Sequence, residues 1–142
     1  MKTPMKLRVL VCGGRDYNDV EEMTRVLNHL KPHMSVLITG EALGADMLAS
    51  NWQRKDYSIQ YRGFHAEWRK YGAAAGPIRN KKMLEEGKPD IVVHFPGGRG
   101  TTNMINLAKA AGVPTFEHSA IGPGRPFNFD NLTRAKIGAP AK

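Results

Sequence analysis

A glycine-rich turn between an apolar segment and a helix-like segment is the part of the sequence best suited to binding chemistry. Residues 90–95 read DIVVHF, residues 96–102 read PGGRGTT, and residues 103–112 read NMINLAKAAG. Where a strand ends in glycines and the chain restarts as a helix, the first backbone N–H groups of that helix have no intrachain partner. They lie at the positive end of the helix dipole, which favours a phosphate or another anion. The sequence therefore predicts an anion site in this turn.

A second glycine turn directly follows the apolar run at 7–12. Gly13 and Gly14 allow the backbone to approach a ligand closely, as in dinucleotide-binding turns. Arg15 suits a phosphate and Tyr17 suits a base or a ribose, while both also fit a plain exposed turn between a strand and a helix.

Two further segments carry polar residues near expected helix starts. Asp46 ends the turn GEALGAD at 40–46, in the first turn of the next helix. An aspartate there most commonly caps the helix, and alternatively holds a ribose hydroxyl. Arg79 and Asn80 follow Pro77, which suits the first turn of a helix, so they are predicted at the helix end that meets an anion.

The apolar patterning predicts the elements that position these turns. Five β-prone segments, at 7–12, 35–39, 57–61, 90–95 and 113–116, alternate with segments of helical spacing. This alternation predicts an α/β fold, a Rossmann-like three-layer α/β/α arrangement with a mostly parallel sheet of about five strands. The expected buried helix faces include Met47, Leu48 and Trp52; Ile78, Met83 and Leu84; and Met104, Leu107, Ala108 and Ala111.

Composition favours one globular domain with an anionic partner. The chain has 142 residues, 41% of them hydrophobic, and a net charge of +8, which favours nucleotides, nucleic acid or phosphorylated metabolites. We expect a nucleotide-binding domain over 1–119 and a basic, Gly/Pro-rich tail over 120–142, with Phe127 and Phe129 anchoring the tail on the domain or on a second subunit.

Other features exclude several classes of protein. No apolar run approaches the length of about 18 residues that a membrane span needs. Cys12 is the single cysteine, which excludes an internal disulfide and fits a cytoplasmic protein. The histidines have no ligand spacing, because Pro32 interrupts the helix between His29 and His33, so we expect no metal and no cofactor.

Four motifs in order resemble the SLOG superfamily, and most closely its YspA/YpsA-related branch, which is frequent in bacteria and their phages. They are GGRDY, GxxxGAD-x-LA-x-x-W, W-x-x-YG-x-x-AGPxRN-x-x-M and FPGGRGT, and the match spans about 7–117. The resemblance implies that the PGGRGT turn holds a phosphate at the strand ends. With the residue pattern, it predicts a ligand-binding set of Gly13, Gly14, Arg15, Gly40, Gly44, Asp46, Arg79, Asn80, Pro96, Gly97, Gly98, Arg99, Gly100, Thr101 and Thr102.

The superfamily includes the Lonely Guy phosphoribohydrolases, and their catalytic residues are matched here only in part. Those enzymes pair an arginine, in R-x-x-x-M, with the glutamate of PGGxGTxxE. Arg79 and Met83 match the first motif, but Met104 stands at the glutamate position. A methionine transfers no proton, so catalysis would need another carboxylate. The candidate catalytic residues are Arg79 and Asp16, with Asp46, Glu41 and Glu67 as further carboxylates.

Three functions are compatible with the sequence, in order from the most to the least favoured. The first is a module that binds or senses a nucleotide-derived phosphorylated ligand, and the second is a hydrolase that cleaves an N-glycosidic bond in such a ligand. The third is binding of single-stranded nucleic acid by the basic surface, which is not favoured because no nucleic-acid-reading motif is present. The resemblance also implies a homodimer.

Overall fold

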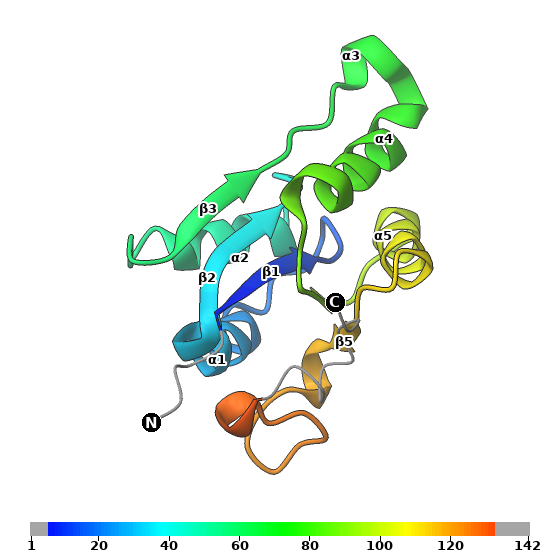
Figure 1. The fold of residues 1–142 in the computed structure, drawn as a ribbon. Coiled ribbons are helices and arrows are strands. Elements are labelled where there is room, and N and C mark those ends of the chain that lie inside the picture. Colours follow the sequence, from blue (N-terminus) through cyan, green and yellow to red (C-terminus); the bar gives the residue numbers. More distant parts are fainter. Residues whose placement is uncertain (1–5, 133–142) are drawn as a thin grey trace.

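The computed structural model describes residues 6–132 and contains one five-stranded sheet (Figure 1). All strand pairs are parallel, in the order β3-β2-β1-β4-β5. The predicted Rossmann-like α/β fold is therefore confirmed. The strands are β1 (Leu7–Cys12), β2 (Met34–Thr39), β3 (Gln60–Gly63), β4 (Ile91–His94) and β5 (Thr115–Glu117).

Helices cover both faces of the sheet. On one face, α1 (Val20–Leu30) and α2 (Ala45–Gln53) close a core that includes Leu27 and Ala49. On the other face, α4 (Ala75–Lys82) and α5 (Arg99–Ala110) close a smaller core around Met83 and Met104. A π-helical turn, Met83–Gly87, extends α4. The short α3 (Trp68–Tyr71) precedes α4 at the upper end of the molecule in Figure 1.

The third strand differs from its predicted position at 57–61. It begins at Gln60, because Asp56 accepts a hydrogen bond from the Ser58 N–H at 2.9 Å and forms a turn there. Tyr57 lies in this turn and is 81% exposed. The fifth strand also starts later than predicted, at Thr115.

Three predicted helix faces are wrong in part. Helix α2 starts at Ala45, so its buried stripe passes through Ala45 and Ala49, and Met47 is exposed. Helix α4 starts at Ala75, which leaves Ile78 exposed. Met104 and Ala108 are buried in α5 as predicted, but Ala111 lies beyond its end and is exposed.

The described part of the C-terminal segment packs against the domain. The rings of Phe127 and Phe129 contact the ring of Phe116 edge-on, with centroid distances of 4.4 and 5.5 Å. Phe129 and Ile121 are buried in the same core as α1. Thus residues 121–129 cover the sheet near β5, below it in Figure 1.

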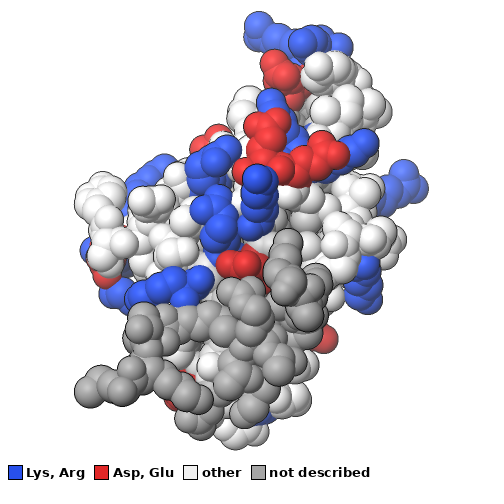
Figure 2. Space-filling model, in the orientation of Figure 1, with Lys and Arg blue, Asp and Glu red and all other residues white. Residues whose placement is uncertain are grey.

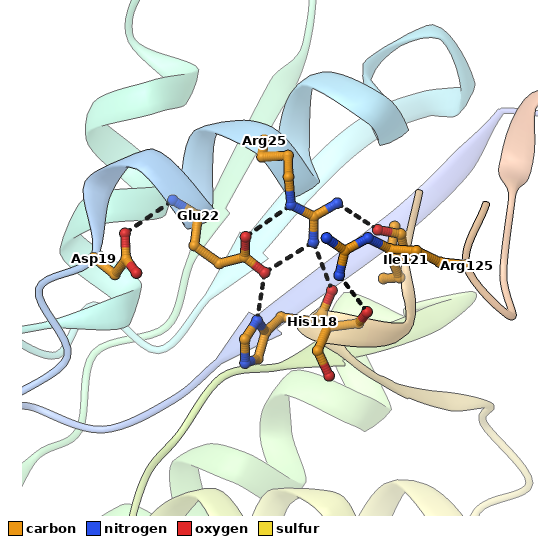
Figure 3. Close-up of polar contacts among 7 residues, drawn as sticks. Asp19, Glu22, Arg25, His118, Ile121 and Arg125 are labelled. Atoms are coloured by element: carbon orange, nitrogen blue, oxygen red, sulfur yellow. Dashed lines mark hydrogen bonds and ion pairs between the residues drawn. The ribbon is translucent and has the colours of Figure 1, made fainter. Parts of the chain in front are cut away.

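A polar network also fastens this segment to α1 (Figure 3). Glu22 accepts two hydrogen bonds from Arg25, at 2.7 and 2.8 Å, and contacts His118 Nδ1 at 2.7 Å. Arg25 in turn donates to the backbone oxygens of His118 and Ile121, at 3.1 and 2.6 Å. The arginine therefore bridges a helix carboxylate and the chain that leaves β5. Within the described residues, no helix has the length and apolarity to cross a membrane.

Candidate functional site

The candidate site lies at the carboxyl edge of the sheet, between β1 and β4. From β1 the chain crosses to β2 on one side, while β4 pairs with β1 on the other side. The turns after neighbouring strands therefore diverge here and leave a crevice, which is where open α/β sheets bind ligands. A cavity of about 540 Å³ occupies this position.

Three turns that are far apart in the sequence form one wall of this crevice. The Gly14 N–H donates to the Pro96 oxygen at 2.7 Å, and the Ala45 N–H donates to the Gly14 oxygen at 3.1 Å. A side chain at Gly44, where φ is +78°, would place its Cβ 2.2 Å from the Gly14 oxygen. A Cβ at Gly97 would lie 2.1 Å from the Thr101 hydroxyl oxygen. These glycines are required for backbone packing.

Most of the residues predicted from the sequence line the main cavity, four others line neighbouring cavities, and two line no cavity. Gly40 lines an adjoining cavity of about 170 Å³, and Asp16, Pro96 and Gly97 line a shallower one of about 390 Å³. Gly44 and Thr102 line none of the three. The predicted residues on the main cavity are Gly13, Gly14, Arg15, Asp46, Arg79, Asn80, Gly98, Arg99, Gly100 and Thr101.

The N-terminus of α5 opens into the main cavity. Its N-cap is Gly98, and the first of its N–H groups with a partner is that of Thr102, which donates to the Gly98 oxygen at 3.0 Å. The N–H groups of Arg99, Gly100 and Thr101 have no partner among the described residues. A Cβ at Gly98 or Gly100 would meet no heavy atom within 4 Å, so both face open space. The end of α5 thus has the geometry that an anion requires.

Arg79 adds a cation to the same cavity. It lies in the last turn of α4, not in the first as the sequence predicted, because the α-helix ends at Lys82 and continues as the π-helical turn Met83–Gly87. Its Nη1 donates to the Gly40 oxygen, and its Nε donates to Asn80 Oδ1 at 2.9 Å. Arg79 is half-buried, which lowers its pKa, and it makes no ion pair with any described residue.

Asn80 connects the two helices at the cavity. Its Nδ2 donates to the Gly100 oxygen at 3.2 Å and to Asn103 Oδ1 at 2.9 Å. Because Asn80 also accepts from Arg79, it fixes the guanidinium relative to the start of α5.

Asp46 is the buried acid of the site. It is 6% exposed, and burial raises its pKa from 3.8 to about 6. Its Oδ2 accepts from the Ala42 N–H at 3.2 Å, and its Oδ1 has no partner among the described residues. The capping interpretation is wrong, because the N-cap of α2 is Gly44 and the carboxylate bonds to the preceding turn.

Several residues on the cavity are absent from the ligand-binding set predicted from the sequence. Trp68, from the W-x-x-YG motif, lies there with its ring 5.2 Å from the Arg15 guanidinium carbon. Cys12, Met83 and the fully buried Met104 form apolar parts of the lining. Tyr17 packs its ring on Phe95 at 5.2 Å and does not line the main cavity. The tryptophan could have been found from its motif, whereas the apolar lining depends on helix placement.

The other functional groups considered from the sequence lie elsewhere. Asp16 is exposed on the shallow cavity, and Glu67 is exposed at the start of α3. Glu41 lines the adjoining cavity with a φ of +56°. Among residues 6–132 no group of three metal-binding side chains is present. Figure 2 shows lysines and arginines scattered on one face, interrupted by a group of acidic side chains.

A five-stranded parallel sheet with helices on both faces and a crevice at its switch point defines the class of Rossmann-like α/β domains. The pattern of the YspA, cpYpsA-related SLOG family matches residues 7–71. The Gene 61 protein of Mycobacterium phage D29 is 32% identical over 118 residues, covering 77% of this chain and 94% of that protein. The chain therefore belongs to the YspA, cpYpsA-related SLOG family.

Solved structures with similar folds are more distant in sequence. DNA processing protein A (DprA) from Streptococcus pneumoniae matches 94% of this chain with a TM-score of 0.64 and 16% identity. This chain spans 55% of that DprA chain. A UDP-N-acetylglucosamine 2-epimerase matches 95% of this chain and 38% of its own, with a TM-score of 0.50 and 14% identity. Both similarities concern the fold alone.

Proposed function

We propose that this protein is a binding or sensing module for a nucleotide or a nucleotide-derived phosphorylated ligand, held in the main cavity. The observation that carries the proposal is the meeting of two anion-binding features on one cavity. The unpartnered N–H groups of α5 and the half-buried Arg79, which has no ion-pair partner among the described residues, both line it. A desolvated cation and a helix N-terminus together favour a phosphate.

The dimensions and the lining fit such a ligand. A cavity of about 540 Å³ is within the range of small-molecule sites. The phosphate would lie at Gly98–Thr101, and the apolar side chains of Cys12, Met83 and Met104 leave room for uncharged parts of the ligand. Family membership supports the proposal, because it suggests a nucleotide-related role.

The test is Gly98→Asp with Gly98→Ala as its control. A Cβ at this position meets no atom within 4 Å, so both variants should fold. The aspartate adds a negative charge and a hydrogen-bond acceptor at the N-cap, where the phosphate would bind, while the alanine adds a Cβ without either. We expect nucleoside mono-, di- or triphosphates to raise the melting temperature of the wild type and Gly98→Ala, but not of Gly98→Asp. A wild type that no nucleotide stabilises would contradict the proposal.

A second candidate function is hydrolysis of the N-glycosidic bond of a nucleotide. Asp46 favours it, because a carboxyl group with a pKa of about 6 on the same cavity as Arg79 is suited to proton transfer near neutral pH. Asp46 is better placed for this than Asp16, which lies on the shallow cavity. Incubation with nucleoside monophosphates should release free base, and Arg79→Ala should abolish the release. Activity that persists in Arg79→Ala would exclude the role given to this arginine.

We also propose that the protein works in the cytoplasm and that nucleic acid is not its main ligand. The buried thiol of Cys12 suits a reducing compartment, and the phage relative suits the interior of a host cell.

We further propose that the protein is a homodimer. Exposed apolar side chains, including those of Leu43, Trp68 and Ile78, offer surface for a second subunit. Light scattering of the purified protein should give twice the mass of one chain.

A further inference from the structure

We propose that the Asp46 carboxylate accepts a hydrogen bond from a sugar hydroxyl of the ligand, so that the site selects ribonucleotides over analogues that lack this hydroxyl. The inference rests on the nucleotide site proposed above. It adds the sugar as the recognised group and gives the ligand an orientation within the cavity.

The proposal starts from a carboxylate oxygen of Asp46 that has no hydrogen-bond partner among the described residues. This oxygen is Oδ1, and Asp46 is only 6% exposed. Buried polar atoms are almost always hydrogen-bonded, and leaving one unsatisfied destabilises the folded protein. Since Asp46 also lines the main cavity, a ligand there can supply the missing donor.

The second step concerns the charge of the group that Asp46 meets. A carboxylate oxygen accepts hydrogen bonds and repels another anion, so the phosphate will not lie against Asp46. The phosphate has its own place at the start of α5 beside Arg79. Asp46 must therefore meet an uncharged O–H or N–H donor of the ligand.

The third step places that donor. Asp46 belongs to α2, which covers one face of the sheet, while Arg79 and the start of α5 come from helices on the other face. The charge of Arg79 nevertheless acts on Asp46, where it partly offsets the rise in pKa that burial causes, so the two side chains are near each other. A ligand that reaches both must therefore present its donor close to its phosphate. In a nucleoside 5′-phosphate the sugar is bonded directly to the phosphate, and the base lies farther away. The sugar hydroxyls are therefore the donors best placed for Asp46.

The experiment compares ligands that differ only in one sugar hydroxyl, so that the base contributes equally to the binding of both. Each of the four ribonucleoside 5′-monophosphates is titrated beside its 2′-deoxy and 3′-deoxy counterparts, by calorimetry, into wild type and Asp46→Asn. A hydrogen bond to a charged group contributes about 1.5–3 kcal/mol, so loss of the recognised hydroxyl should weaken wild-type binding by about 10-fold or more. In Asp46→Asn this difference should shrink, while inorganic phosphate binds as it does to the wild type.

The possible outcomes separate the sugar contact from the proposed phosphate site. If both deoxy series bind the wild type as tightly as the ribonucleotides, the sugar contact is wrong, whatever Asp46→Asn does. If Asp46→Asn weakens every ligand and inorganic phosphate equally, the residue is only structural. If phosphate compounds bind and Gly98→Asp abolishes that binding, the proposed function stands even when the sugar contact fails. If no nucleotide or phosphate binds, both proposals fail together.

Discussion

At the residue scale, Asp46 should destabilise the protein when no ligand is bound. Its pKa is about 6 in the folded chain against an ordinary value of 3.8, so the folded state binds a proton more tightly than the unfolded state. The free energy of unfolding therefore falls as the pH rises from about 4 to about 6, and the full destabilisation is present above that range. Such a difference corresponds to roughly 3 kcal/mol.

The prediction is that Asp46→Asn raises the stability of the ligand-free protein at pH 7.5, by up to about 3 kcal/mol, because the buried charge is removed. The gain should shrink toward pH 4, where the wild-type carboxyl is protonated in the folded state. Urea denaturation of both proteins at the two pH values measures it. An asparagine variant that is less stable at pH 7.5 would show that the carboxylate has a stabilising partner in the folded protein.

Individual residues of the site differ in how well the sequence predicts their positions. The glycines at 98 and 100 and the neighbouring Thr101 follow from a strand-turn-helix pattern, and they do line the cavity. The direction of the Asp46 side chain depends on the Ala42 N–H, which no spacing rule reveals. Counting from Pro96 identified Met104 in place of a glutamate, but only the structure shows that its side chain is fully buried beside the cavity.

At the scale of elements, the contact between α1 and the segment after β5 depends on Glu22. Arg25 and then His118 hydrogen-bond to its carboxylate and hold its pKa down at about 2, against an ordinary 4.5. An acid whose pKa is lowered by folding stabilises the fold at pH values above its pKa in the unfolded chain. It loses this contribution as the pH falls toward 2. The two elements are therefore held more firmly at neutral pH than in acid.

We predict that Glu22→Gln lowers the free energy of unfolding by about 1–2 kcal/mol at neutral pH, because Arg25 and His118 lose their charged partner. Hydrogen exchange should accelerate in residues 118–129, and the difference from wild type should narrow near pH 2. Glu21→Gln is the matched control, since Glu21 is the exposed neighbour on the same helix and has no hydrogen bond from its side chain among the described contacts. Equal exchange in the two variants would contradict the assigned role of Glu22.

Elements also differ in how well their limits could be predicted. The limits of β1 were predicted without error, because a continuous apolar run is bounded by glycine. The helix that carries Arg79 is short: it starts at Ala75 and its α-helical part ends at Lys82, so Arg79 lies in its last turn and not in the predicted first. The third strand was displaced because alternation in YSIQY looks like a strand, while Asp56 holds Tyr57 and Ser58 in a turn.

At the scale of the whole molecule, the order of the strands decides which of the predicted turns lie together. The sequence predicts five strands and a parallel sheet, but it does not say which strands are neighbours. In the order β3-β2-β1-β4-β5 the strands β1 and β4 are neighbours, and this brings the turn after β1 against the turn after β4. That contact places the predicted phosphate turn and the GGRDY turn side by side in one wall of the crevice.

The hydrogen bond from Gly14 to Pro96 has a consequence for the timing of synthesis. The first strand leaves the ribosome long before the partner of its turn is made. A nascent chain that contains α1 and α2 still lacks β4, Arg79 and the start of α5. The pocket therefore forms only after the first turns of α5, up to Met104, have been synthesised. A bound ligand can select only chains whose synthesis has passed this point.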